Sequence, residues 1–252
     1  RYTSEGGWYE CDKIRFRQGT PEKIGGWQRI SATTFQGVCR SLWNWVTLGS
    51  QNLIAVGTNL KYYIENGGAY NDITPLRATV TLTNPFETTS GSPIVVVTDA
   101  NSGYTDGDFV TYSGVSAVGG LTLNGEYQIT LTTTLNEYTI DAGSAASSSA
   151  TGGGTVTAAY QINVGTAFAI PLTGWGASSW SSGTWGVGAT STESIRLWSQ
   201  SNFGEDLVFG PRNGPIYYWD ATSGITTRAV ELSTLGGASN VPTSQKLIEI
   251  SD

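Results

Sequence analysis

The chain has 252 residues, among them 13 Lys or Arg and 20 Asp or Glu, and its formal net charge is −7. It contains no histidine, which excludes a Ser-His-Asp triad and removes the most common metal ligand. Its two cysteines, Cys11 and Cys39, are too few for a disulfide framework or a four-ligand zinc site, so we expect free thiols or a single bridge. No apolar stretch approaches the roughly 18 residues of a membrane-spanning helix. We therefore expect neither an enzyme active site nor a cofactor, and no membrane-spanning segment.

The residue composition predicts an all-β protein. Glycine is abundant, with 33 residues, whereas charged residues make up only 13% of the chain, about half the usual share. No window of ten residues places apolar side chains at helical spacing without an interrupting Gly or Pro. The chain also lacks Met and begins abruptly at Arg1, so we expect it to be a piece of a longer polypeptide.

Cations and apolar residues alternate near the start of the chain, in the pattern of a half-buried strand with a cationic outer face. The apolar positions are Ile14 and Phe16. The basic residues of this segment are Lys13, Arg15, Arg17 and Lys23. We interpret this basic face as a contact with acidic surface on a neighbouring subunit or an adaptor ring, or with DNA phosphate. The alternative is a solvated edge strand that discourages aggregation.

A repeat appears in two copies, residues 42–74 and 197–227, and is interrupted by a long insertion. Each copy is predicted to form short strands joined by Gly-rich turns, and such a meander cannot bury its own faces. We predict partial β-propeller-like blades, with the start of a third blade at Pro242–Ile250. The alternative is a chance similarity between Gly-rich hairpins. The residues expected in the core of the two blades are Trp43, Leu53, Tyr63, Trp198, Leu207 and Tyr218.

The insertion differs in composition from the segments on either side of it. It is rich in Thr, Val, Ser and Gly and is predicted to be a small β-barrel or sandwich. Residues 144–154 are of low complexity and are expected to form a flexible loop. The resulting division is residues 1–77 for the N-terminal strand segment and first blade, 78–165 for the inserted domain, and 166–252 for the remainder. The four expected strands of the insertion are Ile94–Thr98, Asp108–Tyr112, Glu126–Thr132 and Glu137–Asp141.

A Trp- and Gly-rich run follows the insertion, with Trp175, Trp180 and Trp185 at intervals of five residues. We interpret the run as a loop whose indoles pack into the propeller or a neighbouring subunit; the alternative is a carbohydrate-binding platform. Two acidic pairs remain, Asp106 with Asp108 and Glu205 with Asp206. For the first pair, a solvated turn is favoured over calcium binding or catalysis, because Asp in a turn bonds nearby backbone.

The opening run GGWYECDKIRFRQGTPEKIGGW (residues 6–27) resembles the N-terminus of a phage tail-protein family, the tail nozzle proteins, also called tail tubular protein B or packaged-DNA stabilisation proteins. The resemblance continues through TFQGVCRSLWNW (34–45) and NLIAVGTNLKYYI (52–64). The insertion is similar to a small β-module common in phage tail proteins. This resemblance implies a virion protein: a homo-hexameric ring that contacts the portal, the adaptor and other tail proteins, retains packaged DNA, and carries duplex DNA during ejection without sequence-specific binding.

The charge distribution agrees with passage rather than capture of DNA. Residues 1–40 contain seven basic and four acidic residues, whereas the rest of the chain contains six basic and sixteen acidic ones. A protein that holds nucleic acid needs clustered cations to displace phosphate counterions. The alternative function is a host-surface module that binds glycan, which loss of binding in Trp180→Ala would reveal. A glycan-degrading enzyme is least favoured, because no catalytic constellation is visible.

Overall fold

The computed structural model describes residues 12–26, 31–100, 103–167 and 195–251 and confirms the all-β prediction. The described residues form strands and two short 3₁₀ helices, and no α-helix occurs among them. The chain divides into two compact units, residues 1–32 and 33–252, which are described separately.

The described part of the first unit contains one antiparallel hairpin, β1 (Ile14–Arg17) with β2 (Thr20–Lys23). The two residues between the strands, Gln18 and Gly19, both have positive φ, at 50° and 80°. Such a two-residue connection suits the right-handed twist of the flanking strands. The hairpin is therefore specified locally by its turn.

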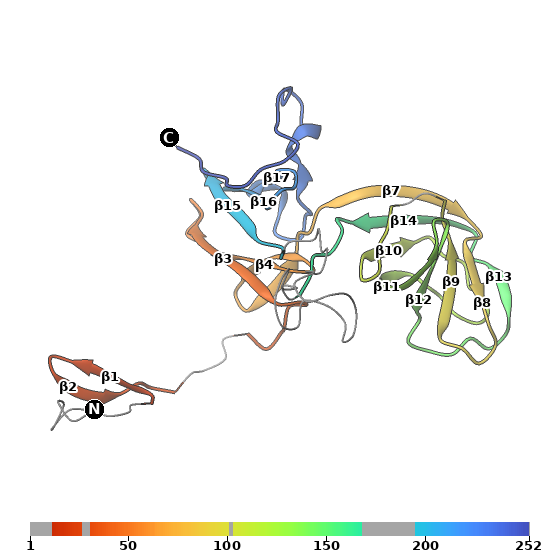
Figure 1. The fold of residues 1–252 in the computed structure, drawn as a ribbon, viewed down its shortest axis with the longest axis horizontal. Coiled ribbons are helices and arrows are strands. Elements are labelled where there is room, and N and C mark those ends of the chain that lie inside the picture. Colours follow the sequence, from red (N-terminus) through yellow and green to blue (C-terminus); the bar gives the residue numbers. More distant parts are fainter. Residues whose placement is uncertain (1–11, 27–30, 101–102, 168–194, 252) are drawn as a thin grey trace, which may run out of the picture. The chain divides into compact units, whose positions relative to one another are not determined.

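The second unit contains two four-stranded antiparallel meanders and an eight-stranded sheet (Figure 1). The first meander consists of β3 (Cys39–Val46), β4 (Asn52–Thr58), β5 (Tyr62–Asn66) and β6 (Ala69–Asp72). The second consists of β15 (Trp198–Phe203), β16 (Asp206–Pro211), β17 (Tyr217–Trp219) and β18 (Val230–Glu231). Two 3₁₀ helices, η1 (Ala221–Ser223) and η2 (Leu232–Thr234), flank β18. The two copies of the sequence repeat, residues 42–74 and 197–227, thus supply most of the two meanders, although β18 lies beyond the second copy.

The meanders pack against each other and share one hydrophobic core. The ring of Tyr62 stacks on that of Phe209 with centroids 4.0 Å apart. Indole groups join the sheets at their edges: Trp45 Nε1 donates to the Glu205 carbonyl at 3.0 Å, and Trp198 Nε1 donates to the Thr58 carbonyl at 2.7 Å. Both of these indole N–H groups therefore have a partner on the opposite sheet, as a buried polar group requires.

The two meanders present opposite faces of their sheets to each other. In the first, the buried Tyr62 directs its backbone toward β6, because Ile73 N donates to Tyr62 O. In the second, Ile216 O points toward β18 and accepts from Leu232 N. Because successive residues of a strand point their N–H and C=O to opposite sides, those of the buried Tyr217 point toward β16. The two sheets have the same strand order and direction. In such sheets, a residue whose N–H and C=O point to one neighbouring strand has its side chain on one face, and a residue whose N–H and C=O point to the other neighbouring strand has it on the other face. The sheets therefore stack in one sense, as successive propeller blades do.

The eight-stranded sheet runs from Leu76 to Gln161 and is nearly closed into a barrel. Its strand order is β13-β8-β9-β12-β11-β10-β14-β7. The strands are β7 (Leu76–Thr83), β8 (Phe86–Thr88), β9 (Ile94–Thr98), β10 (Phe109–Ser113), β11 (Gly125–Thr134), β12 (Glu137–Asp141), β13 (Ala150–Gly152) and β14 (Thr155–Gln161). We call this sheet, with its loops, the inserted module.

A bent two-stranded ribbon closes the module, since β7 and β8 form one side of it and β13 and β14 the other. The bend is fixed where Asn84 and Gly154 exchange hydrogen bonds: Asn84 N donates to Gly154 O at 2.8 Å, and Gly154 N donates to Asn84 Oδ1 at 2.9 Å. The φ of Gly154 is +74° and that of Asn84 is +49°, which favours Gly and tolerates Asn. The barrel therefore closes at a corner built by two suited residues.

A chain of buried hydroxyl groups crosses the barrel interior. Tyr112 and Tyr138 share a hydrogen bond of 2.5 Å, Tyr138 and Tyr160 one of 2.7 Å, and Tyr160 donates to Asp99 Oδ2 at 2.5 Å. Burial raises the pKa of the Tyr138 and Tyr160 hydroxyls, so they stay protonated and act as donors. The three rings thus fill the core without leaving a hydroxyl unbonded.

The six residues expected in the blade cores differ in how far they are buried. Leu53, Tyr63, Trp198 and Leu207 are buried. Trp43, in contrast, is 38% exposed, and Tyr218 is half-buried, with its hydroxyl donating to Asp206. The two indoles match in sequence but do not occupy equivalent positions in the strand pairing. Trp43 stands opposite Ala55, whereas Trp198 stands opposite Pro211.

Two other segments differ from their predictions. Residues 144–154 are not a flexible loop throughout, because Ala150–Gly152 forms β13 against β8 and Ala146 is buried. Pro242–Ile250 does not begin a third blade and contains no strand. Instead it follows the second meander, where Gln245 N donates to Gly214 O at 3.0 Å and Ile248 N donates to Ser199 Oγ at 2.8 Å.

Candidate functional site

A cluster of four charged side chains joins the inserted module to both meanders. Lys61, at the start of β5, is buried, with its Nζ 3.0 Å from Asp72 Oδ2 and in contact with Glu126. Arg228, which precedes β18, lies 3.2 Å from Asp72 and 3.7 Å from Glu126. We call these four residues, Lys61, Asp72, Glu126 and Arg228, the ionic junction. Asp72 ends β6 and Glu126 lies in β11, so two sheets and the segment before β18 contribute to the junction.

Local hydrogen bonds place Lys61 at this point. Thr58 Oγ1 accepts from Leu60 N at 3.1 Å and from Lys61 N at 2.8 Å, which fixes the turn between β4 and β5. Lys61 Nζ also lies 4.5 Å from the centroid of the Phe109 ring, which belongs to β10 of the module. A cation over an aromatic face is attracted to it, so Phe109 adds a further link between meander and module.

Neutral groups complete the ionic junction. Gln161 Nε2, at the end of β14, donates to Glu126 Oε2 at 2.6 Å, and Arg228 donates to the Thr74 carbonyl at 2.7 Å. Burial alone would raise the pKa of Asp72, but Arg228 and Lys61, with hydrogen bonds from Thr74, hold it below its usual range. Two cations face two carboxylates, so the cluster is balanced, and its chemistry suits positioning rather than proton transfer.

A second buried carboxylate fixes the same end of the module. Asp108 is fully buried, and it accepts from Thr105 N at 2.9 Å and from Val164 N at 2.8 Å. Burial raises its pKa in spite of these bonds. The turn role predicted for Asp108 agrees with the Thr105 contact, but the expectation of a solvated side chain was wrong. Asp108 instead ties the irregular segment after β14 to the turn that precedes β10.

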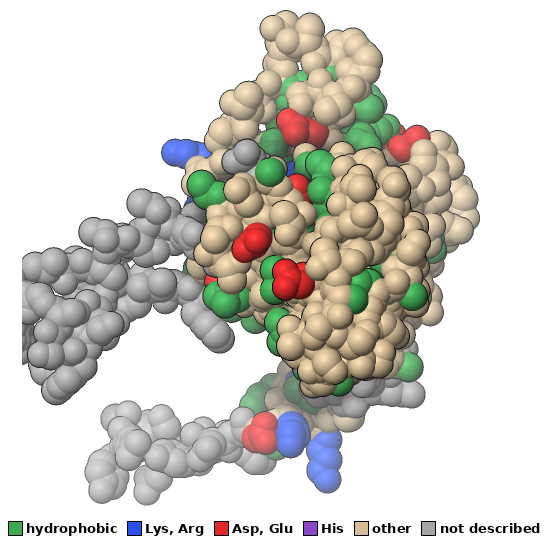
Figure 2. All heavy atoms as spheres, turned by 90° about the vertical axis from the view of Figure 1, so that its right-hand side faces the viewer, with side chains coloured by type: hydrophobic (Ala, Val, Ile, Leu, Met, Phe, Trp, Pro, Cys, Tyr) green, Lys and Arg blue, Asp and Glu red, His purple; other side chains and the backbone are tan. Residues whose placement is uncertain are grey.

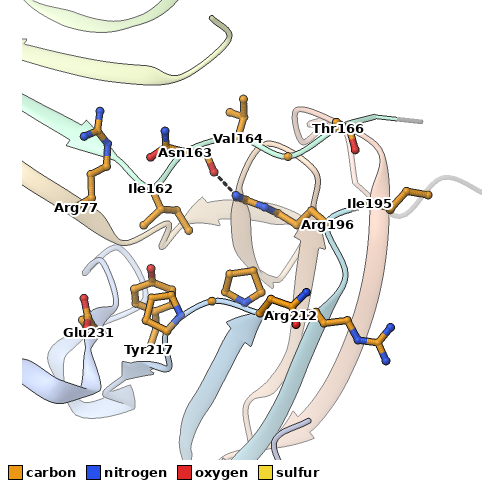
Figure 3. Close-up of a pocket in the computed structure, with 15 residues that line it drawn as sticks. Arg77, Ile162, Asn163, Val164, Thr166, Ile195, Arg196, Arg212, Tyr217 and Glu231 are labelled. Atoms are coloured by element: carbon orange, nitrogen blue, oxygen red, sulfur yellow. Dashed lines mark hydrogen bonds between the residues drawn. The ribbon is translucent and has the colours of Figure 1, made fainter. Parts of the chain in front are cut away.

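A cavity of about 550 Å³ lies between the module and the second meander. Arg77, Arg196 and Arg212 line it, with Glu231 as an acidic lining residue. Figure 3 shows the three guanidinium groups spread around the cavity rather than converging on one point. Arg196 donates to the Asn163 carbonyl and lies 5.5 Å from the Trp198 ring centroid, and burial lowers its pKa to about 10. The cavity therefore has a cationic lining but no assembled oxyanion cradle.

The basic residues predicted as a contact surface lie on the hairpin of the first unit. Lys13, Arg15, Arg17 and Lys23 are all exposed. Arg15 pairs with Glu22 across the strands at 3.1 Å, and Lys13 lies 3.7 Å from Asp12. Of the two apolar residues expected on the buried side of the strand, Ile14 is half-buried, whereas Phe16 is 51% exposed. The cationic face is thus accessible for a partner.

The other predicted sites are placed as follows. Trp175, Trp180 and Trp185 lie outside the described residues. Cys39 is an exposed free thiol. Within residues 12–26, 31–100, 103–167 and 195–251, no group of three or more His, Cys, Asp or Glu side chains is arranged to hold a metal ion. None of the helices in these ranges is long and apolar enough to cross a bilayer.

Sequence reasoning missed the ionic junction. Its residues are spread from 61 to 228, and no local motif connects them. One signal was present, because Lys61 and Arg228 are two of only six basic residues after position 40. In a chain with so few basic residues, a Lys or Arg next to an apolar strand is a candidate for a specific ion pair.

No family model and no curated protein matches the chain. Among solved structures, it is similar to the phage phi92 endosialidase, with 16% sequence identity and a TM-score of 0.30. The match covers 84% of this chain and 32% of that protein, so the chain spans about a third of its length. A likeness of this extent assigns neither a family nor an activity.

Proposed function

We propose that this chain is a non-enzymatic structural component of a bacteriophage tail, part of the nozzle or tube below the portal and adaptor. In this role it lines or supports the conduit for DNA ejection and helps to retain packaged DNA. Its place is the virion, and its partners are copies of itself in a ring, the adaptor, the portal and other tail proteins.

The observation that supports this proposal most directly is the interruption of two stacked meanders by a nearly closed barrel. The motifs in residues 6–27, 34–45 and 52–64 resemble tail nozzle proteins, and that resemblance implies propeller blades together with an inserted β-module. The chain has two blade-like sheets, with the eight-stranded sheet between them in sequence. A fold alone does not assign a function, so the proposal rests on this architecture together with the motifs.

The surface of the module supports a role without tight DNA binding. No Lys or Arg occurs between Arg77 and Arg196, whereas eight acidic residues do. In Figure 2 the side of the second unit that carries the module shows mostly uncharged polar side chains and backbone, with isolated acidic groups. Such a surface repels phosphate weakly and offers few cations for counterion release. DNA would pass along it without being held.

The ionic junction supports a structural rather than a catalytic role. It connects the module to both meanders through side chains whose charges balance and whose remaining polar atoms bond Gln161 and Thr74. A network of ion pairs and hydrogen bonds of this kind favours one geometry. In a tail component, this would hold the module at a constant position relative to the blades.

The experiment that tests the proposal is immunogold labelling of purified phage particles with an antibody raised against this chain. The proposal predicts label at the tail, in the region between the capsid vertex and the tail tip. Particles without label after mild disruption, while the chain is abundant in infected cells, would overturn it. The glycan-binding alternative predicts instead that the purified chain binds host-surface saccharide and that label lies at the distal tip.

A further inference from the structure

The cavity between the module and the second meander contains a buried cation without a counterion. Arg196, in the segment before β15, lines the cavity, and its Nη1 group is buried and has no hydrogen-bond partner among the described residues. No carboxylate in this part of the chain forms an ion pair with it. A buried guanidinium N–H without an acceptor costs free energy, so an acceptor supplied by a ligand would stabilise it.

Two carboxylates near the cavity do not supply this acceptor. Asp108 attracts Arg196 electrostatically, but its two oxygens accept from backbone N–H groups at 2.9 and 2.8 Å. Glu231 lines the cavity and accepts instead from Ser233 Oγ at 2.6 Å. Three arginines therefore line the cavity against one carboxylate, and the lining as a whole attracts anions.

Three contacts hold Arg196 in one position before a ligand binds. Its Nη2 donates to the Asn163 carbonyl, and its Cζ lies 5.5 Å from the centroid of the Trp198 ring. Its stem packs over Gly165, where an added Cβ would lie 2.4 Å from Arg196 Cβ and 2.9 Å from Arg196 Nε. An anion that binds this guanidinium therefore avoids most of the entropy cost of ordering a long side chain.

A second cation lies at the mouth of the cavity. Arg212 and Asn213 both line the cavity and are exposed, so it opens to solvent there. Arg212 forms no ion pair with the carboxylates that the structure describes. In Figure 3 the guanidinium groups of Arg196 and Arg212 lie apart instead of converging on one point. The lining also contains the buried Thr166 Oγ1, which has no hydrogen-bond partner in the described ranges. The cavity therefore offers two separate positions for negative charge.

We propose that this cavity binds an organic anion with two or more carboxylate groups on a flexible chain, one group at Arg196 and another at Arg212. A planar guanidinium matches a planar carboxylate, so each arginine binds one group. A compact phosphate ion is bound best by several donors that converge on it, which the separated guanidinium groups do not provide. A free small polycarboxylate and an Asp- or Glu-rich peptide segment share the required chemistry. The proposal does not depend on the proposed tail function.

The test is isothermal titration calorimetry of the full chain at low ionic strength, with dicarboxylates of increasing length from succinate to suberate. Butyrate, which has one carboxylate, and inorganic phosphate are the comparison ligands. We expect the affinity to rise with chain length until both arginines are reached. The best dicarboxylate should bind about tenfold or more tightly than either comparison ligand. Phosphate that binds as tightly as the best dicarboxylate would overturn the proposal, and so would dicarboxylates that do not bind or bind no more tightly than butyrate.

Two variants assign the binding to the cavity. Arg212→Gln changes an exposed side chain and should abolish the dependence on chain length, so that each dicarboxylate binds as butyrate does. Arg196→Gln should weaken the binding of every carboxylate by about tenfold or more, the usual effect of losing a charge-assisted hydrogen bond. Lys246→Gln is the matched control, because Lys246 is an exposed cation outside the cavity lining, and this variant should bind as the unaltered chain does.

Circular dichroism and thermal unfolding establish that each variant is folded; if Arg196→Gln is not, Arg212→Gln alone decides the outcome. An Arg212→Gln variant that keeps the full dependence on chain length contradicts the proposal. A labelled hexaglutamate peptide then distinguishes the two sources: tighter binding than the best dicarboxylate indicates a peptide segment, and weaker binding indicates a free polycarboxylate. None of these outcomes affects the tail localisation, so the two proposals fail independently.

Discussion

The indole of Trp198 donates to the carbonyl of Thr58 at 2.7 Å, and its ring occupies the space that a side chain at position 57 would need. A Cβ built on Gly57 would lie 2.5 Å from Trp198 Cδ1 and 2.4 Å from Ser41 Oγ. Gly57 is thus required for the close approach of the two meanders, not for an unusual φ. This contact makes the packing of the blades open to a direct test.

Gly57→Ala should destabilise the second unit by about 1–3 kcal/mol, the usual cost of overpacking a filled core. The added methyl group forces either the indole or β4 to move, and the rigid indole has no flexible end to yield. Urea denaturation monitored by Trp fluorescence measures the change. Gly49→Ala is the matched control, because its Cβ would have nothing closer than 3.7 Å and should leave stability nearly unchanged. Equal stability of the two variants would show that the meanders do not pack as described.

Lys61→Met should destabilise the chain by about 3 kcal/mol, at the lower end of the range for breaking a buried ion pair. The substitution keeps the volume of the side chain but leaves Asp72 and Glu126 with only Arg228 as a cation. The effect is at the lower end because the side chains of Asp72 and Glu126 are 21% and 28% exposed. The same denaturation experiment measures it.

The control for Lys61→Met is Lys246→Met, which removes a charge from an exposed position. This variant should lie within about 0.5 kcal/mol of the unaltered chain, as surface substitutions usually do. If both lysine variants had the same small effect, the ionic junction would not stabilise the attachment of the module.

The ionic junction should also give a defined pH dependence. The pKa of Asp72 is lowered in the folded state, so its contribution to stability is present above its unfolded pKa of about 3.9 and is lost as the pH falls through the folded value. The difference in unfolding free energy between the unaltered chain and Lys61→Met should therefore be constant between about pH 5 and 7, because the folded and unfolded pKa values of Asp72 both lie below this range. It should shrink below about pH 4. A difference that stays unchanged down to pH 3 would contradict the assignment of Asp72 as the paired carboxylate.

Duplex DNA should show no measurable affinity for the purified chain at physiological salt. Six basic residues against sixteen acidic ones after position 40 supply few sites for phosphate. Fluorescence anisotropy with a labelled duplex measures the affinity over a series of salt concentrations. Tight binding that weakens steeply with salt would contradict the idea that DNA slides past this protein. Loss of such binding in Arg15→Glu/Arg17→Glu would assign it to the hairpin of the first unit.

The elements best predicted from the sequence are strands with clear alternation and turns on both sides. Ile94–Thr98 and Glu137–Asp141 form β9 and β12 with the expected bounds. Both pair with each other inside the barrel, where one face is buried and the other exposed, so period-two patterning and burial coincide. The repeat is equally informative, because the first copy coincides with four strands of one meander and the second copy with three strands of the other.

Features that depend on register or on long-range pairing could not be predicted. Trp43 and Trp198 match in sequence, yet their partners across the strand differ, and pairing register is a property of the folded sheet. Ala150–Gly152 has the composition of a flexible loop, but it forms β13 because the bent ribbon brings it beside β8. Tertiary context outweighed local composition there. The ionic junction unites residues far apart in the chain, which no local pattern encodes.

The measurement that tests the proposed tail role most directly is an electron cryo-microscopy reconstruction of tailed phage particles in whose purified protein this chain is detected. The account predicts density below the portal and adaptor into which two stacked four-stranded meanders and an attached eight-stranded barrel fit, repeated around the DNA channel. A tail tube fully accounted for by other proteins, with no density for this interrupted pair of sheets, would contradict it.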